Sequence, residues 1–357
     1  MNERTKVICL TPIKNEDWIL DTFLKATSLW ADHIIVADQN STDKSKEIAQ
    51  RFDKVIYVKN EGNKYDELSR QELLLQEARK ISGKKLLIAL DADEFFTNID
   101  ITSPSWQTML NAEEGTVFSF NWLHISSDFT KIKKSNFDFP WGAFGFMDNG
   151  SKHNGRNIHS PRIPIPEKCI NIGIKDNWVL HYNLISEERL NSKNRWYMLH
   201  ETINKQRTNI IFQNHYYNYS NFFDDALPFE PKLLRAYWDK GIDMYSIRKD
   251  KINLEYNDTS EQWKNVDHQW KSIEYYWWDH EMLLKIQEYG AKKFRYIDIW
   301  DYDWKGLAKY LGFKNPDQFT DPRGLRGKLF IKWVRYSKGK SSIYVRIINR
   351  LMRMFIY

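Results

Sequence analysis

An α/β fold, with a mixed, mainly parallel sheet and helices on both of its faces, is predicted by the first hundred residues. Short apolar runs alternate there with segments of helical spacing, and the runs are continuously hydrophobic rather than alternately polar. Strands of that kind are buried on both faces, as in parallel sheets covered by helices. Ligands bind such sheets at the carboxyl ends of the strands. The polar residues that follow each apolar run are therefore the first candidates for function.

The expected elements follow one another in strict alternation. Strands are predicted over residues 7–10, 33–37, 54–58 and 85–90, and helices over residues 16–29, 45–52 and 66–81. Apolar side chains at helical spacing, among them Ile19, Leu20 and Phe23, justify the first helix. Residues 85–90, with the sequence KLLIAL, are the clearest strand that is buried on both faces.

The rest of the chain has other patterns. Between about 100 and 180, strand-like pieces such as residues 116–123 lie among turns rich in Gly, Pro and Asn, which indicates mixed β structure with long loops. From 186 to about 315 the pattern is mainly helical and rich in Trp and Tyr. We expect a catalytic domain over residues 1–185, a helical, aromatic-rich region over 186–325 that completes the acceptor side, and a basic amphipathic tail over 326–357.

Charge is unevenly distributed along the chain. From Arg326 onward there are nine of the 53 basic residues and none of the 47 acidic ones, which leaves 44 basic against 47 acidic residues in the body. A nearly neutral body argues against a nucleic-acid partner, which would require a basic groove. The tail interleaves its cations with apolar residues, which is typical of a helix lying on anionic lipid. A terminal helix packed on the body, or a basic arm, is the other interpretation.

Cysteine content and hydropathy bear on the cellular compartment. The chain has two cysteines, Cys9 and Cys169, so no disulfide framework or cysteine-based zinc site is predicted. No apolar run has the length of a signal peptide or a membrane span. We expect a cytoplasmic protein that is peripheral on the inner face of the plasma membrane.

The strongest chemical signal is a pair of carboxylates that follows the fourth expected strand. Asp91 and Asp93 stand one residue apart, so their side chains share a face where the chain is still extended. Hard oxygen ligands of this kind suit Mn²⁺ or Mg²⁺, which bridges to substrate phosphates. A strand-end turn rich in Asp is the alternative. We expect a metal site, because the motif stands at the end of a buried strand.

Three further groups of polar residues stand near strand ends or at the start of a helix. The turn after the first strand, with Thr11, Pro12, Asn15 and Glu16, can receive a nucleotide on its backbone N–H groups, or Asn15 can cap the following helix. After the second strand, Asp38 is expected to hold a ligand, and Asp43 to cap a helix. Arg70 can meet a diphosphate or remain a solvated surface residue.

Taken together, these residues resemble family 2 glycosyltransferases of the GT-A (Rossmann-like) fold over about residues 5–98. The resemblance is carried by Thr11-Pro12-x-x-Asn15-Glu16, Asp38-x-x-Ser41-x-Asp43, Ser69-Arg70-Gln71 and Asp91-x-Asp93. It implies that Asp38 contacts uracil or an equivalent base. It also implies that Asp91 touches ribose or metal, that Asp93 is a metal ligand, and that the reaction inverts the anomeric configuration.

Beyond residue 100 the resemblance weakens. Family members often have a Glu-Asp pair that holds the catalytic base, followed by Gln-x-x-Arg-Trp. Here Arg195-Trp196 is present without the Gln, and no convincing Glu-Asp pair occurs. The base is therefore unassigned, with Asp148, Glu167 and Asp176 as candidates, and processive polymer synthesis is not implied.

Two later features are candidates for completing the site. His181 ends a short apolar strand, where GT-A enzymes often supply a further metal or diphosphate ligand; a histidine at the edge of the core is the alternative. A basic helix with Arg189, Lys193 and Arg195 can clamp the leaving diphosphate or form a solvated face.

Two other segments are interpreted by their position. The loop over residues 148–162 lies where an acceptor would bind, although a surface loop is an equal interpretation. A second Asp-x-Asp, Asp301-Tyr302-Asp303, precedes a helical pattern and is expected to cap that helix rather than to bind metal.

The predicted function is metal-dependent transfer of a sugar from a nucleotide-sugar, UDP-linked, to a glycan or lipid-linked acceptor. A nucleotidyltransferase is the rival enzyme, but it would need a glycine-rich phosphate loop, which the turn at residues 11–16 lacks. A non-catalytic glycan-binding protein on a transferase scaffold is the rival of another class. The intact pair Asp91 and Asp93 argues against it.

Overall fold

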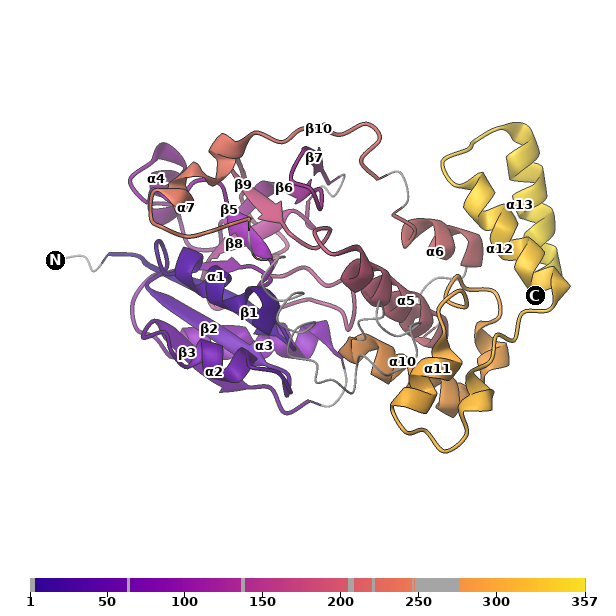
Figure 1. The fold of residues 1–357 in the computed structure, drawn as a ribbon. Coiled ribbons are helices and arrows are strands. Elements are labelled where there is room, and N and C mark those ends of the chain that lie inside the picture. Colours follow the sequence, from indigo (N-terminus) through magenta and orange to yellow (C-terminus); the bar gives the residue numbers. More distant parts are fainter. Residues whose placement is uncertain are drawn as a thin grey trace. The chain divides into compact units, whose positions relative to one another are not determined.

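The computed structural model describes residues 4–62, 65–135, 139–204, 209–219, 222–245, 247 and 276–356. The chain divides into two compact units (Figure 1), of which unit 1 comprises Met1–Ile185 and Phe223–Thr259 and unit 2 comprises Ser186–Phe222 and Ser260–Tyr357. Each unit is described by itself below.

Unit 1 begins with the alternation that the sequence predicts. Its first strands are β1 (Lys6–Ile13), β2 (His33–Asp38), β3 (Val55–Lys59) and β4 (Lys85–Ala89). Its first helices are α1 (Asp17–Thr27), α2 (Ser45–Ala49) and α3 (Glu67–Arg79). The strands lie in the order β3-β2-β1-β4 and all run parallel. The carboxyl ends of β1, β2 and β4 therefore meet at one edge of the sheet.

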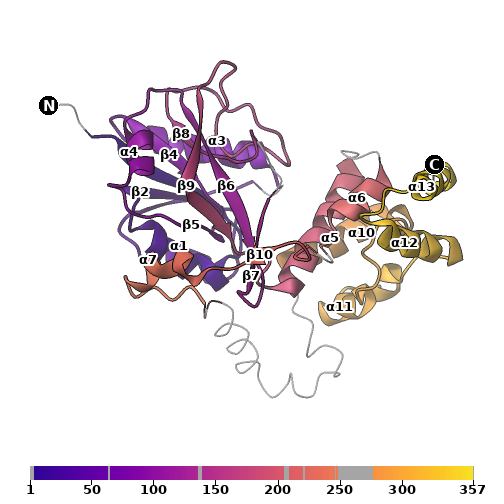
Figure 2. The same cartoon turned by 90° about the horizontal axis from the view of Figure 1, so that it is seen from above.

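Both faces of these strands are covered, as their continuous hydrophobicity predicts. Alternate residues point to opposite faces of a strand. Cys9 and its neighbours on one face pack with Phe23 of α1, while Leu10 and its neighbours on the other face pack with Leu74 of α3. Figure 2 shows α3 on one side of the sheet and α1 on the other. The predicted mixed α/β sheet with helices on both faces is confirmed.

The sheet continues beyond β4 with strands of both directions. These elements are β5 (Glu94–Phe96), α4 (Pro104–Leu110), β6 (Val117–Ile125), β7 (Lys131–Lys134), β8 (Ala143–Met147) and β9 (Asn171–His181). β8 pairs antiparallel with β4 and β6, and β9 runs parallel to β6 and antiparallel to β5. The predicted mixture of β structure and loops in this stretch is confirmed.

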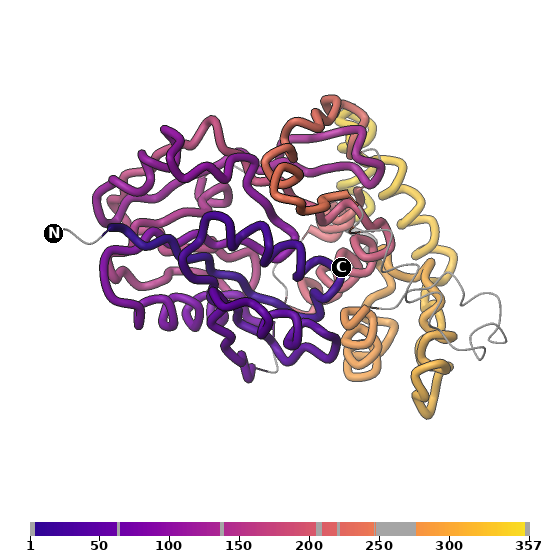
Figure 3. The backbone as a smooth tube through the Cα atoms, turned by 60° about the vertical axis from the view of Figure 1, so that its left-hand side comes forward, coloured from indigo at the N-terminus to yellow at the C-terminus, as the bar shows by residue number. Residues whose placement is uncertain are grey.

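The last part of unit 1 is a segment that the sequence pattern does not separate from the helical region. It holds β10 (Leu227–Pro228), the 3₁₀ turn η1 (Pro231–Leu234) and α7 (Arg235–Trp238). β10 pairs with β7, and the Tyr237 hydroxyl donates to the carbonyl of Phe96 in β5. Figure 3 shows this segment, in orange-red, beside the magenta strands of the same unit. The chain thus returns to unit 1 after a first passage through unit 2.

Unit 2 is helical in its described residues. Its elements are α5 (Glu187–Asn204), α6 (Ile210–Tyr216), α10 (Trp277–Tyr289), η4 (Ala291–Phe294), α11 (Trp304–Tyr310), η5 (Pro316–Phe319), α12 (Leu325–Ser337) and α13 (Ile343–Ile356). The predicted helical character is confirmed for these residues. The predicted tail consists of two helices, α12 and α13. Among the described residues, no helix combines the length and the apolar character needed to cross a membrane.

Candidate functional site

The register of the sheet places a group of acidic and histidine side chains at one place in unit 1. β4 ends at Ala89, the chain turns through Asp91 and Asp93, and β5 begins at Glu94. Glu94 pairs with His181 on β9, and His181 pairs in turn with His124 on β6. Asp93, Glu94, His124 and His181 are all buried. Strand pairing therefore brings residues almost ninety positions apart into contact.

Arg162 supplies the positive charge of this group. Its guanidinium forms a bidentate ion pair with Glu94, and its Nη2 lies 3.1 Å from Asp91 Oδ2. The same guanidinium lies over the rings of Phe144, at 4.8 Å, and Trp122, at 5.3 Å. Burial raises the pKa of the Glu94 carboxyl, and the charge of Arg162 opposes that shift. We take the pair as ionised, because a bidentate pair of this geometry is strong in a buried site.

Asp93 and His181 form a second contact in the group. His181 Nε2 lies 3.5 Å from Asp93 Oδ1, which is long for a hydrogen bond, and within the described part of the chain neither ring nitrogen of His181 has a hydrogen-bond partner. The imidazole ring stacks on Trp122 at 4.8 Å, with an angle of 16° between the planes. A buried imidazole with both nitrogens unsatisfied is costly unless something else binds it. Trp122 thus holds the ring in place while its nitrogens stay available.

His124 lies behind this pair and is unsuited to carry charge. Its ring centroid lies 5.1 Å from that of His181, and its Nδ1 lies 3.0 Å from Asn183 Oδ1. Burial, together with the neighbouring His181, lowers the pKa of His124 to about 3. The residue is therefore neutral near pH 7.

Three carboxylates, from Asp91, Asp93 and Glu94, lie together in this group. Arg162 pairs with Asp91 and Glu94, and the His181 imidazole lies beside Asp93. Carboxylate oxygens and imidazole nitrogens are ligand atoms that suit a divalent cation.

The protein supplies few side chains that could bind a cation, so a bound substrate would have to supply the remaining ligands. Among the described residues, no group of three or more His, Cys, Asp and Glu side chains forms a complete cage for a metal ion. Mg²⁺ sites commonly use one or two protein ligands and fill the remaining positions with water and substrate phosphate. The predicted metal ligands are Asp91, Asp93 and His181. In the structure Asp93 contacts His181, whereas Asp91 forms an ion pair with Arg162. Their roles as ligands stay predictions.

Asp38 lies at the end of β2 and is already hydrogen-bonded. One carboxylate oxygen accepts from the backbone N–H of Ser41, at 2.9 Å, and from its hydroxyl, at 2.6 Å. The other oxygen accepts from the Tyr57 hydroxyl at 2.7 Å. Burial and this contact raise the pKa of Tyr57, which keeps its hydroxyl protonated as a donor. Three donors orient the carboxylate. A carboxylate can accept further hydrogen bonds, so the contact of Asp38 with a nucleobase stays a prediction.

The turn after β1 is joined to the turn after β2, which differs from the expected nucleotide cradle. The backbone N–H groups of Asn15, Glu16 and Asp17 donate to the side chains of Ser41, Ser45 and Asp43, each at 2.9 Å. Those N–H groups are therefore not available to a phosphate in this structure. Asn15 does not cap α1: its φ is +55°, and its side chain contacts Thr42. In this structure the N–H groups link the two turns, and the binding of a nucleotide by this turn stays a prediction.

The remaining residues of this turn are placed as follows. The Thr11 hydroxyl is buried and donates to the carbonyl of Leu90, which fixes the start of the Asp91 turn against β1. Pro12 is partly buried within β1, opposite Ala37 of β2. Glu16 accepts from the Trp18 indole N–H at 2.7 Å. Direct contacts of Thr11, Pro12, Asn15 and Glu16 with a nucleotide stay predictions.

The loop over residues 148–162 is anchored along its length. Asp148 forms an ion pair with Arg79 at 2.8 Å, and the N–H of Ser160 donates to Glu67 at 2.8 Å. Gly155 packs so closely that an added Cβ would lie 2.2 Å from the Ser160 hydroxyl. Because Arg162 follows directly and enters the acidic group, the loop is built into the site.

The three candidates for the catalytic base have different surroundings in the structure. Asp148 forms an ion pair with Arg79, and its role as catalytic base stays a prediction. Asp176 is exposed on β9 and lies five residues before His181, which is roughly 16 Å along a strand. Glu167 is exposed in the segment before β9. None of the three is brought to Asp93 by a described contact.

The two predicted phosphate-binding arginines have other neighbours. Arg70 lies on α3 with its guanidinium 5.1 Å from the Tyr65 ring. In unit 2, Arg195 on α5 pairs with buried Asp279 at 3.2 Å and lies 4.2 Å from the Tyr302 ring. A role for either in binding the diphosphate stays a prediction.

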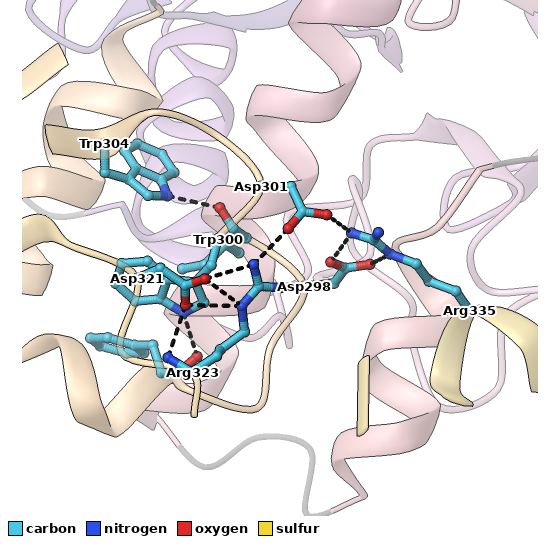
Figure 4. A network of polar contacts seen from close by, with 9 residues as sticks. Asp298, Trp300, Asp301, Trp304, Asp321, Arg323 and Arg335 are labelled. Atoms are coloured by element: carbon cyan, nitrogen blue, oxygen red, sulfur yellow. Dashed lines mark hydrogen bonds and ion pairs between the residues drawn. The ribbon is translucent and has the colours of Figure 1, made fainter. Parts of the chain in front are cut away.

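The second Asp-x-Asp segment, in unit 2, is built differently. Asp303 caps α11 by accepting from the N–H of Gly306 at 2.9 Å. Asp301 accepts from Arg323 and Arg335, each at 2.6 Å, and Arg335 also binds Asp298 (Figure 4). The predicted helix capping is confirmed.

Sequence reasoning missed Glu94 as a member of the site and placed Arg162 only in a general loop. Glu94 follows Asp93 directly but precedes two phenylalanines, so it resembles the start of another strand, which it also is. The contribution of Trp122 and His124 depends on β6 pairing with β9, and sequence alone gives no sign of that pairing. The available signal was a third carboxylate directly after Asp91-x-Asp93 and directly before the apolar pair Phe95 and Phe96.

Comparisons with known proteins identify the N-terminal part. Residues 9–160 match the model of the family described as glycosyl transferase family 2. No curated protein sequence matches the chain. Among solved structures, a similar one is glucosyl-3-phosphoglycerate synthase from Mycobacterium tuberculosis in complex with Mn²⁺, UDP and phosphoglyceric acid, with 20% identity over 33% of this chain and 43% of that one, at a TM-score of 0.25.

Two nucleotide-transferring enzymes are also similar in structure. The inositol-1-phosphate CTP transferase from T. maritima has 12% identity over 54% of this chain and 94% of its own, at a TM-score of 0.32. A nucleotidyl transferase from Methanothermobacter thermautotroptrophicus has 14% identity over 33% of this chain and 62% of its own, at a TM-score of 0.23. With scores of this size, the likenesses carry no argument about activity.

Proposed function

We propose, from the match of residues 9–160 to the model of glycosyl transferase family 2, that this chain transfers a sugar from a nucleotide-sugar to an acceptor hydroxyl with the help of a divalent cation. The donor is proposed to be UDP-linked, and the acceptor to be a glycan or a lipid-linked glycan. The observation that carries the proposal is the contact of buried Asp93 with buried His181, at the end of β4.

Asp93 and His181 are proposed to hold Mn²⁺ or Mg²⁺, with water and the donor's diphosphate as the other ligands. When bound, the cation would stabilise the negative charge of the nucleoside diphosphate as it leaves. The Trp122 ring keeps His181 oriented, since the two rings are stacked. Arg162 holds Glu94 and Asp91 in place through its ion pairs.

Asp38 is proposed to recognise the base of the donor nucleotide. Its position at the end of β2, with Tyr57 and Ser41 fixing its two oxygens, leaves capacity to accept a hydrogen bond from a ring N–H. Uracil has such a group, and this is the physical basis for preferring UDP. We propose inversion of configuration from the family resemblance alone, with attack by an acceptor hydroxyl that a carboxylate base assists.

A binding measurement tests the nucleotide and the metal together. The thermal midpoint of the purified chain should rise with UDP plus Mn²⁺ and change little with either alone, because each completes the ligand set of the other. Asp93→Asn should abolish the rise, and Asp301→Asn, which alters the second Asp-x-Asp, should retain it. No rise with either UDP or GDP in the presence of metal would refute the donor assignment.

A product measurement separates the proposal from a nucleotidyltransferase. Incubation with UDP-sugars and Mn²⁺ should release UDP by slow hydrolysis even without acceptor, and the sugar that supports release identifies the donor. A nucleotidyltransferase would instead release pyrophosphate from UTP and a sugar 1-phosphate. A chain that only binds glycans would release neither product.

The proposal includes a place at the membrane surface, since residues 326–357 combine cations with apolar residues and contain no carboxylate. A lipid-linked acceptor would be met there.

A further inference from the structure

The basic tail consists of two helices with different surroundings. On α12, Phe330, Ile331 and Val334 are buried against Ile211 of α6, and Arg335 is engaged by Asp298 and Asp301. On α13, the side that faces the rest of unit 2 carries buried Val345 and partly buried Met352. Figure 1 shows the two helices side by side, and the Trp333 indole N–H on α12 donates to Asn349 on α13 at 2.7 Å. α12 is therefore part of the helical body.

The other side of α13 leaves large apolar side chains uncovered. The exposed fractions are 68% for Ile343, 75% for Tyr344, 53% for Ile347 and 48% for Leu351. At about 100° per residue, these four positions fall within an arc of about 100°. A continuous apolar stripe of this kind on a surface marks an interaction site rather than scattered exposure.

Three exposed arginines run along the edge of the apolar stripe. Arg346, Arg350 and Arg353 stand at spacings of four and three residues, so they share one face of α13. Around the helix axis, the edge of this face lies about 20° from the position of Ile343. Neither α12 nor α13 contains an acidic residue. Three cations on a helix of 14 residues also argue against insertion across a bilayer and favour a helix in its plane.

We propose that the stripe Ile343, Tyr344, Ile347 and Leu351 of α13, with Arg346, Arg350 and Arg353 beside it, docks on an anionic lipid bilayer. In the bound state the apolar side chains enter the boundary between headgroups and acyl chains, and the guanidiniums bind lipid phosphates. A second copy of the chain is a poorer occupant, because a two-fold interface on this face would bring arginines close to arginines. This inference rests on the membrane placement included in the proposed function and specifies its docking face, while it does not depend on the sugar-transfer chemistry of unit 1.

Vesicle co-sedimentation tests this docking face. The full chain at 150 mM salt should bind vesicles of phosphatidylcholine with 30% phosphatidylglycerol, should bind pure phosphatidylcholine at least tenfold more weakly, and should be released by 1 M salt. Replacing Arg346, Arg350 and Arg353 by Gln should weaken binding by about a hundredfold, since each cation contributes about fivefold. Ile347→Glu should also abolish it.

Matched controls keep the test independent of folding and of catalysis. Ile170 in unit 1 is 57% exposed, close to Ile347, so Ile170→Glu should bind vesicles like the wild type. Hydrolysis of UDP-sugar without vesicles should be equal in all these variants, which separates failure of docking from failure of the proposed chemistry. Equal binding to neutral vesicles, absence of binding, or wild-type binding by Ile347→Glu would overturn the proposal. So would a dimer in solution that Ile347→Glu dissociates.

Discussion

Two segments of this chain have the same Asp-x-Asp pattern but different physical surroundings. At Asp91-x-Asp93, Asp91 pairs with Arg162, while Asp93 is buried beside the His181 imidazole. At Asp301-x-Asp303 each carboxylate has its partner, in Arg323, Arg335 or the first turn of α11. A short acidic motif therefore has no fixed role, because its neighbours determine whether its carboxylates cap a helix, pair with arginines or lie beside a histidine.

The largest contrast is expected when one arginine is removed from each segment. Arg162→Met leaves buried Glu94 without its cation and should lower the free energy of unfolding by about 3–5 kcal/mol. Arg335→Met removes a guanidinium that is 45% exposed and should lower it by about 1 kcal/mol or less. Urea unfolding of the two variants measures both values. Equal losses would show that the acidic group of unit 1 is not a buried charge cluster.

Removal of one carboxylate from each segment should affect activity in one case only. Asp93→Asn should lower metal-dependent release of UDP by about a hundredfold or more, because the loss of a metal ligand removes several kcal/mol of transition-state stabilisation. Asp301→Asn should keep the wild-type rate. Initial rates at saturating Mn²⁺ decide the comparison, and wild-type activity in Asp93→Asn would contradict the metal assignment.

The histidine of the first segment distinguishes it further, since the second has none. His181→Ala should raise the apparent Kd for Mn²⁺ in the presence of UDP by about tenfold or more. Calorimetric titration of the metal measures this change, with circular dichroism as the control for folding. An unchanged Kd would restrict His181 to a packing role against Trp122.

The second segment should respond in stability alone. Asp303→Ala removes the cap of α11 and should lower the free energy of unfolding by about 1 kcal/mol, with release of UDP unchanged. The matched change Asp303→Asn preserves an acceptor and should recover most of the loss. A drop in activity in Asp303→Ala at unchanged stability would mean that this segment does have a chemical role.

The smallest effect concerns pH. Burial opposes the shift, but the hydrogen bonds from Arg323 and Arg335 lower the pKa of Asp301. A carboxyl whose pKa is lower in the folded state contributes stability above its unfolded value, near 4, and loses it as pH falls through the folded value. As pH falls, the stability of unit 2 should therefore decrease slightly less in Asp301→Asn than in the wild type. Thermal midpoints between pH 5 and 2 measure the difference.

Much of unit 1 was predictable because local and global signals agree there. Continuous apolar runs with turns between them fix the strands β1 to β4, and strand ends fix the neighbourhood of Asp38 and Asp93. The partner of the acidic group was not predictable in this way. Arg162 stands 68 residues after Glu94, in a loop without periodicity, and its contact exists only because the loop is anchored at Glu67 and Arg79.

The tail shows the same limit in another form. Its composition predicts a basic amphipathic segment but not which helix packs on the body. Three-dimensional contacts assign Phe330 and Ile331 to the core of unit 2 and leave Ile347 and Leu351 exposed, although all four are apolar residues among cations. Burial of one helix against another depends on neighbours distant in sequence, here α6 and the segment with Asp298.

The central claim is that Asp93 and His181 bind a divalent cation together with the donor's diphosphate. Crystals of the full chain grown with UDP and Mn²⁺, with diffraction data collected at the manganese absorption edge, test it most directly. The account predicts one anomalous peak, about 2.0–2.3 Å from an Asp93 oxygen and a His181 nitrogen, in contact with the diphosphate. An anomalous peak beside Asp298 and Asp301, or ordered UDP with no manganese at Asp93, would contradict it.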